Sequence, residues 1–408
     1  ARFRASMLCV IDLTARKWYN FVMDDLYSRY RAVCVFKDAA RAALPLVELA
    51  SCRTQSERLE AAAAVFRAVA EYGADTTGEW LCGLVKSDDN PLSRAAARGE
   101  RVSGRLLAQA DRELDLFKRL AAVKPDDHCT DADREFFPKF GYGGFSLTID
   151  RLVRFCGDNG CGILSCASAF VYDGTTDGFV PTATEPVRLG DLKNYAEEKA
   201  EVVKNTENFI AGLPAFNTLL YGDRGTGKST TVRAVAYEYR DSVKVIELKK
   251  TDIGALDKIR ARLAGLKQKF IVFVDDLSFE ENDARVDGFK AALEGSLAGG
   301  GNVLLYCTSN RRHLVKETER EVKNRNDETQ AELALFDRFG LVVTYINPDK
   351  AEFIDIFKQI LTSRGVKWRE EYASVAELAA LKKGGRSPRA AKQIADLIES
   401  TYAEVERR

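Results

Sequence analysis

The sequence predicts an α/β fold, with a five-stranded parallel sheet, a helical lid behind it and a mainly helical domain in front of it. Three observations support this prediction. A glycine-rich loop joins an apolar strand to a helix-forming run at residues 219–230. A second apolar run, residues 269–274, ends in two carboxylates, as expected of a strand buried on both faces. Alanine-rich amphipathic segments dominate roughly the first 130 residues.

The predicted N-terminal domain covers residues 1–180. Residues 59–72 are an alanine-rich amphipathic run, and residues 106–120 repeat apolar side chains at helical spacing. From residue 136 to 180 the sequence changes to glycine-rich turns and short apolar strands, 141–149 and 167–172, so we expect a small β-containing part there. The helical faces fit a protein core better than a partner groove, and no motif in them names a substrate.

A proline-marked linker, residues 181–186, leads into the predicted core at residues 187–347. The helical lid follows at residues 348–408. Its last helix begins at a Ser-Pro pair and carries Arg389 in its first turn.

The glycine-rich loop has the pattern Gly-x4-Gly-Lys-Ser, which is the pattern of a phosphate loop when it follows a strand and precedes a helix. The glycines allow the backbone to direct N–H groups at phosphate oxygens, and the positive end of the helix faces the same anion. Lys228 would reach the β- and γ-phosphates, and the Ser229 hydroxyl would bind Mg²⁺. The alternative, a glycine-rich turn with a solvated lysine, leaves the flanking strand and helix unexplained. The nucleotide-binding residues are therefore predicted to be Gly222, Asp223, Arg224, Gly225, Thr226, Gly227, Lys228, Ser229 and Thr230.

Two carboxylates follow the apolar run 269–274 directly. The carboxyl end of a parallel strand lies in the crevice where open α/β sheets bind ligands, beside the phosphate loop. Asp275 would hold Mg²⁺ through its water shell, and Asp276 would orient or deprotonate the attacking water. A strand that simply ends in two solvated aspartates is the alternative, which the spacing from the phosphate loop disfavours.

Two further polar residues lie beside predicted strands. Residues 302–310 form a third apolar strand, and Asn310 at its end could hold the water or the γ-phosphate from the far side. A polar residue after a strand is also an ordinary turn signal. Arg338 closes a helical stretch before the fifth strand, residues 341–346.

This order of elements resembles the AAA+ ATPases. The resemblance implies that residues 222–230 are the Walker A loop and that Asp275 and Asp276 are the Walker B pair. It implies ATP and Mg²⁺ as ligands. The remaining motifs of that superfamily, a first sensor, an arginine finger and a second sensor, correspond to Asn310, Arg338 and Arg389.

A narrower resemblance is to a family of predicted bacterial AAA+ ATPases of unassigned function. It is carried by Gly222–Ser229, by Asp-Asp-Leu-Ser-Phe-Glu at 275–280 and by Thr-Ser-Asn-Arg-Arg-His-Leu at 308–314. It covers about residues 186–405, and before that only Asp89–Ala96.

One departure from the AAA+ pattern concerns the catalytic base. Most members carry Asp-Glu at the acidic strand end, whereas this chain carries Asp275-Asp276, so the second carboxylate is one methylene shorter. General-base catalysis requires hydrogen-bond reach, so we expect slow hydrolysis. Glu280 or Glu281 is an alternative base.

The resemblance also implies base contacts and an assembly. In AAA+ proteins a segment similar to Leu189–Tyr195 packs beside the adenine. Arg338 would act on the site of a neighbouring subunit, which requires a homo-oligomeric ring or partial ring. A local salt bridge of Arg338 with Asp337 or Asp349 is the alternative.

The composition limits which other classes of protein the chain could belong to. Lys+Arg and Asp+Glu both total 61 in 408 residues, so no global charge attracts nucleic acid or a membrane. No apolar run is long enough to span a membrane, and no signal-peptide core opens the chain. The nine cysteines are scattered and odd in number, which favours reduced thiols and a cytoplasmic location. Cys156, Cys161 and Cys166 lack the close pairs of a metal site, so we interpret them as apolar residues, and His313 as structural.

The sequence predicts Mg²⁺-dependent ATP binding and hydrolysis, coupled to remodelling or moving a macromolecular partner. One alternative is a slow or non-hydrolysing ATP-dependent switch, which the Asp-Asp pair favours. Another is a DNA-handling protein, which a basic cluster in the lid supports modestly. Binding of nucleotide phosphates, together with a solvated helix end, also explains this cluster. Its residues are Lys382, Lys383, Arg386, Arg389 and Lys392.

Overall fold

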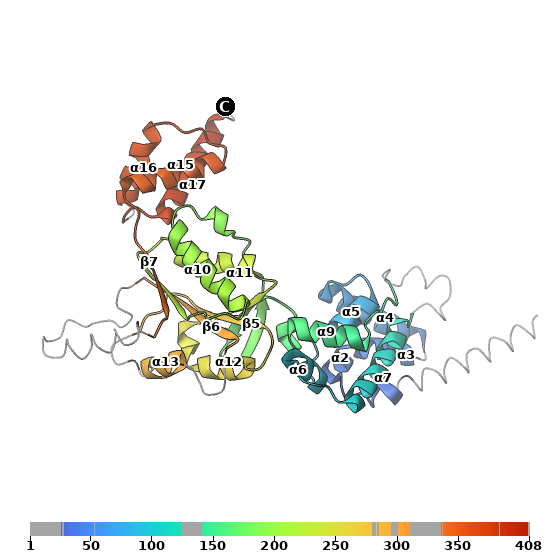
Figure 1. Ribbon diagram of the computed structural model, residues 1–408. Helices are drawn as coiled ribbons and strands as arrows, with labels where there is room; N and C mark the ends of the chain where they lie inside the picture. The colour runs from blue at the N-terminus through green and yellow to red at the C-terminus, as the bar shows by residue number, and fades with distance from the viewer. Residues whose placement is uncertain are drawn as a thin grey trace, which may run out of the picture. The chain divides into compact units, whose positions relative to one another are not determined.

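The chain divides into two compact units, Ala1–Cys166 and Ala167–Arg408, and each is described by itself (Figure 1). Within the described part of the chain, no helix is both long enough and apolar enough to cross a membrane. The computed structural model describes residues 26, 28–52, 54–124, 141–279, 283, 285–294, 301–310, 336, 338–382 and 384–406.

The first unit consists of helices around one apolar core, which includes Phe36, Trp80 and Phe117. Both helices predicted for this region are present, and each extends a few residues beyond the predicted range. Thr54 caps α4 by accepting from the Glu57 N–H, and Gly73 ends the helix in the left-handed conformation. The elements are α2 (Lys37–Ala42), α3 (Leu44–Ser51), α4 (Gln55–Tyr72), α5 (Thr77–Lys86), α6 (Pro91–Arg98), α7 (Gly104–Ala121), α9 (Ile149–Asn159) and the short η1 (Gly162–Ser165).

The second unit contains one sheet in the order β2-β1-β4-β5-β6-β3-β7. All neighbouring strands are parallel except β1 and β2, which form an antiparallel hairpin. The central strands β5 and β6 are almost wholly buried, which matches their continuous apolar sequence. The strands are β1 (Ala169–Asp173), β2 (Gly178–Thr182), β3 (Thr218–Gly222), β4 (Val243–Glu247), β5 (Lys269–Val274), β6 (Val303–Ser309) and β7 (Leu341–Tyr345).

The α/β class is confirmed, but the expected five strands are wrong because the sheet has seven. The predicted strand 141–149 is wrong, because only Gly141 forms a bridge, with Thr76, and Ile149 begins α9. The segment 167–172, which the sequence assigned to the N-terminal domain, supplies β1 and pairs in parallel with β4 through Phe170 and Ile246. Asp177 in the hairpin turn forms an ion pair with Lys258 on α12 at 2.5 Å. A short apolar strand does not reveal which sheet it joins, because strand pairing is decided by contacts far away in the sequence.

Helices cover both faces of the sheet (Figure 1). On one face α10 and α11 pack on apolar side chains of the strands, including Ile271, Tyr306 and Tyr345. On the other face lie α12 and α13. The elements between the strands are η2 (Leu189–Asp191), α10 (Ala196–Ile210), α11 (Lys228–Glu238), η3 (Lys250–Ala255), α12 (Leu256–Leu263) and α13 (Arg285–Glu294).

The segment after β7 is helical, with α15 (Lys350–Ser363), α16 (Glu371–Lys382) and α17 (Pro388–Glu406). These helices have an apolar core of their own, which includes Phe353 and Ile394. Asp349 starts α15 with a reciprocal cap to Glu352. This helical part is called the lid below.

Candidate nucleotide-binding site

The glycine-rich loop runs from the end of β3 to the start of α11, as the sequence predicts. Gly222 has φ 132°, and a Cβ there would lie 2.0 Å from the carbonyl oxygen of Tyr345 on the neighbouring strand. No side chain fits at this position, so the close approach of β3 and β7 requires glycine. Gly227 caps α11 without a side-chain hydrogen bond, which leaves the backbone N–H groups at the helix start directed into the loop.

Lys228 lies inside this loop and is 4% exposed. Its Nζ donates to the carbonyl oxygens of Gly222 at 3.0 Å and Asp223 at 2.7 Å. Burial lowers the pKa of Lys228, and the nearby carboxylates act in the opposite direction. A buried cation held by two neutral carbonyls gains strongly from an anion, which is the property that a phosphate site requires.

The Asp275 carboxylate at the end of β5 meets three side chains. The Ser229 and Thr308 hydroxyls both donate to its Oδ1 at 2.5 Å. A guanidinium nitrogen of Arg233 lies 3.6 Å from Oδ2. The structure therefore brings Ser229 and Asp275 together, and these hydroxyl and carboxylate oxygens are the hard ligands that suit Mg²⁺.

Asp276 adopts φ 52°, a left-handed conformation that is uncommon for residues other than glycine. Its backbone N–H donates to the Thr308 hydroxyl at 3.0 Å, and its Oδ1 accepts from the Asn310 amide at 2.7 Å. The conformation turns the chain directly after Asp275, so the two neighbouring carboxylates have separate partners. The predicted base and the predicted first sensor are thus in direct contact.

The first turn of α17 lies against the phosphate loop. The backbone N–H of Arg389 donates to the Gly225 carbonyl oxygen at 3.1 Å. A Cβ on Gly225, which has φ 78°, would lie 2.9 Å from Ser387 Oγ and 3.1 Å from Arg389 Cβ. The structure therefore brings the backbone of Arg389 to the loop, and the Arg389 side chain is exposed.

Arg338 lies at the other end of the sheet from its own phosphate loop. Thr218 pairs with Leu341 and Gly222 with Tyr345, so β3 and β7 run in parallel. Arg338 precedes the amino end of β7, whereas the phosphate loop follows the carboxyl end of β3. At ~3.3 Å per residue the strand separates the two by about 13 Å or more.

The predicted base-contact segment lies beside the exit of β7. The Tyr195 hydroxyl donates to the Ile346 carbonyl oxygen at 2.8 Å, and its ring lies 5.0 Å from that of Tyr345. Asn194 and Tyr195 have φ 68° and 55°, and such consecutive left-handed residues are typical of functional sites. Tyr345 also accepts from the Asp223 N–H at 2.9 Å, so this segment is connected to the phosphate loop.

Two residues of this site, Arg233 and Thr308, were not predicted from the sequence. Arg233 lies four residues after Ser229, on the same face of α11, so helical spacing could have found it. Thr308 lies two residues before Asn310, on the same face of its strand. The carboxylate of Asp223, one of the predicted nucleotide-binding residues, accepts from the Asn347 N–H at 2.8 Å, at the entry to the lid. No local signal predicts this last contact.

The lid's basic cluster is less uniform than the sequence suggests. Arg386 donates through Nε to both carboxylate oxygens of Glu377, at 3.0 and 3.1 Å, and through a terminal nitrogen to Oε1. It therefore has a fixed acidic partner. Lys383 lies outside the described residues.

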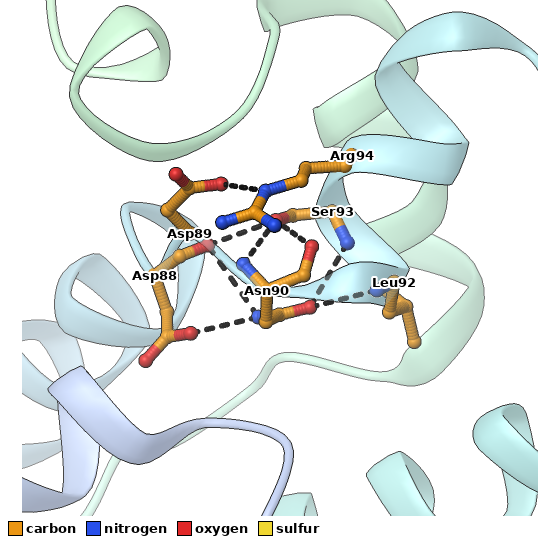
Figure 2. Close-up of polar contacts among 6 residues, drawn as sticks. All are labelled: Asp88, Asp89, Asn90, Leu92, Ser93 and Arg94. Carbon is orange, nitrogen blue, oxygen red and sulfur yellow. Dashed lines mark hydrogen bonds and ion pairs between the residues drawn. The ribbon is translucent and has the colours of Figure 1, made fainter.

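The segment Asp89–Ala96, which carries the resemblance outside the core, forms the start of α6 (Figure 2). Asn90 caps the helix through bonds from the Leu92 and Ser93 N–H groups, and its amide donates to Asp88 Oδ1 at 2.8 Å. Asp89 forms an ion pair with Arg94 at 2.8 Å. These contacts show that the polar residues of this segment cap the start of α6, so their presence needs no bound ligand to explain it.

The three cysteines that the sequence analysis interpreted as apolar residues differ in their burial. Cys156 is buried, which raises its pKa to about 12, whereas Cys161 is partly buried and Cys166 is exposed. Within the ranges that the structure describes, no three His, Cys, Asp or Glu residues are grouped as metal ligands. Glu280, Glu281, His313 and Asp337 lie outside those ranges.

The parallel sheet, the phosphate loop, the acidic strand end and the helical lid define a protein of the AAA+ superfamily. The chain belongs to the family described as "Protein of unknown function (DUF815)", whose model matches residues 165–402. The match begins within two residues of the second unit, and so includes the β1–β2 hairpin.

Similarity to characterised proteins is partial. A proteasome-activating nucleotidase of Methanococcus maripaludis is 30% identical over 219 residues, which are 47% of this chain and 49% of that protein. The replication factor C large subunit of Sulfurisphaera tokodaii is 29% identical over 114 residues, 25% of this chain and 26% of that protein. The chain spans about half the length of the first of these relatives and about a quarter of the length of the second. A solved structure, the RuvB Holliday junction branch migration motor of Thermotoga maritima, is 17% identical with a TM-score of 0.39, over 54% of this chain and 67% of that one.

Proposed function

We propose that the chain binds ATP together with Mg²⁺ and hydrolyses it slowly. One observation supports this most strongly: at one edge of the sheet, the phosphate loop that holds Lys228 is joined to the acidic strand end by the Ser229–Asp275 hydrogen bond, and Asn310 bonds to the adjacent Asp276. The relatives that match part of the chain include a nucleotidase, which agrees with this proposal. We retain the cytoplasm as the proposed location.

Binding would exchange the contacts of Lys228. Its ammonium would leave the carbonyl oxygens of Gly222 and Asp223 for the more strongly attracting β- and γ-phosphates. Ser229 and Asp275 would hold Mg²⁺, and the bound ion would neutralise part of the negative charge of the phosphates. Thr308 would keep Asp275 oriented, since its hydroxyl is buried and donates to that carboxylate.

Hydrolysis would depend on Asp276 and Asn310. Asp276 would accept a proton from the attacking water, and Asn310 would hold that water or the γ-phosphate. The hydrogen bond between their side chains must open or rearrange for this to happen. Together with the short Asp276 side chain, it predicts low turnover.

A second candidate function is an ATP-dependent switch that scarcely hydrolyses. The Asn310–Asp276 contact favours it, because the Asn310 amide occupies the Asp276 oxygen that would accept a proton from the attacking water. In both versions the nucleotide would control remodelling or movement of a protein partner, within a homo-oligomeric ring or partial ring. Nucleic acid receives little support, since Arg386 is paired with Glu377.

A titration of the purified protein with ATP and Mg²⁺ tests the proposal. Lys228→Ala should abolish ATP binding, because it removes the buried cation of the loop. Lys267→Ala is the matched control, since this exposed lysine precedes the amino end of β5, away from the loop. Asp276→Asn should retain ATP but stop hydrolysis. Unchanged ATP affinity in Lys228→Ala would refute the assignment of the phosphate loop.

A further inference from the structure

A pair of charged side chains joins the end of the α16–α17 loop to α16. Gly384 and Gly385 have φ 95° and 134°, conformations that glycine adopts readily and that other residues rarely adopt. Arg386 then closes a bidentate contact with Glu377 on α16. The two side chains are only 33% and 14% exposed. Planar bidentate pairing fixes the direction of the guanidinium as well as its distance.

The chain passes from this pair directly to the phosphate loop. Ser387 follows Arg386 and caps α17 by accepting from the Ala390 N–H at 3.2 Å. Pro388 restricts the backbone between Ser387 and Arg389, because its ring fixes φ. The Arg389 N–H donates to the Gly225 carbonyl oxygen at 3.1 Å. Only two residues separate the charged pair from the arginine beside the loop, so little freedom remains between them.

The surrounding charges favour this pairing. Lys350 adds a positive charge near Glu377, and Asp349 adds a negative charge near Arg386. The hydrogen bond from Arg386 lowers the pKa of Glu377, which keeps the carboxylate charged at neutral pH. The pair is therefore intact under the conditions in which nucleotide binding is measured.

We propose that Glu377 and Arg386 are positioning residues that set Arg389 against the phosphate loop, so that their pairing strengthens nucleotide binding through Arg389. The inference rests on the proposed ATP site and extends it to the lid. Neither Glu377 nor Arg386 needs to touch the nucleotide.

A double-mutant cycle on the full chain tests this inference, with the ATP dissociation constant as the readout. Glu377→Gln should weaken ATP binding by about three- to tenfold, within the range of couplings measured between residues in contact. In an Arg389→Ala background the same change should have no further effect. An equal effect in both backgrounds would mean that the pair acts only on lid stability, and would overturn the inference.

Two further variants complete the experiment. The charge swap Glu377→Arg with Arg386→Glu should restore part of the affinity lost in Glu377→Gln, because the opposite charges can pair again. Glu399→Gln is the control, since it removes another lid contact, with Arg364 at 2.9 Å, and should leave the affinity unchanged. Absent ATP binding in the parent protein would refute the proposed function itself. Normal binding in the parent and in Glu377→Gln would refute only the positioning role.

Discussion

Asn310 donates an amide hydrogen bond to the Asp276 carboxylate across 2.7 Å. The residue assigned to sense the nucleotide is thereby joined to the residue assigned to activate water. Asn310 follows β6 and Asp276 follows β5, and these neighbouring parallel strands bring the two side chains to one edge of the sheet. The contact makes base activation depend on the side chain that would touch the γ-phosphate or the water.

Asn310→Ala should lower the rate of hydrolysis without abolishing ATP binding, because it removes the side chain proposed to hold the attacking water or the γ-phosphate and leaves Lys228 intact. We expect a loss on the order of 10²-fold, typical of a group that assists proton transfer. Single-turnover measurements with saturating ATP would show it. A rate equal to that of the parent would assign Asn310 to the turn alone.

Asp276→Glu should raise the rate of hydrolysis. The added methylene carries the carboxylate further toward the attacking water, and proton transfer requires hydrogen-bond reach. Multiple-turnover assays would measure the change, with Asp276→Asn as the inactive reference. A slower enzyme would show that the native length and the left-handed backbone at Asp276 are matched to each other.

Thr308→Val should destabilise the second unit and weaken its response to Mg²⁺. The substitution removes a buried hydroxyl that donates to Asp275 and accepts from the Asp276 N–H. An unsatisfied buried group costs about 1–3 kcal/mol, so the free energy of unfolding should fall by about that amount.

Thr308→Ser retains the hydroxyl and serves as the control for that prediction. Denaturant unfolding and a Mg²⁺ titration of ATP hydrolysis would compare the two variants. Equal behaviour of the valine and serine variants would show that the hydroxyl has no role in orienting the carboxylates.

Arg338 should act across a subunit boundary, because it lies at the opposite end of β7 from its own phosphate loop. Arg338→Ala and Lys228→Ala should each be inactive, whereas a mixture should recover some hydrolysis at interfaces that combine an intact loop with an intact arginine. An arginine supplied in this way contributes about 10³–10⁵ in rate in other phosphate-loop enzymes.

Subunit assembly must be measured alongside this mixing experiment, by sedimentation with ATP present. Mixed subunits that assemble without regaining activity would contradict action in trans. If the parent protein stays monomeric with ATP and still hydrolyses it, action in trans would be contradicted as well.

Local sequence patterns are sufficient to predict the features that are contiguous in the chain. The phosphate loop is one run of nine residues, 222–230, and the two carboxylates directly follow an apolar strand, so local pattern was sufficient for both. The α/β class and the AAA+ superfamily follow from the same motifs. Helices α4 and α7 were also visible, because amphipathic spacing is a local property.

Contacts between segments that are distant in the sequence depend on how the whole chain folds. Whether the strand 169–173 joins the sheet depends on its pairing with β4, about seventy residues later in the chain. Likewise Thr308 reaches Asp275, and the Asp223 carboxylate reaches the Asn347 N–H, because parallel strands align their ends. Residue types and spacing do not specify such partners, since each side chain has several chemically equivalent choices until packing leaves one.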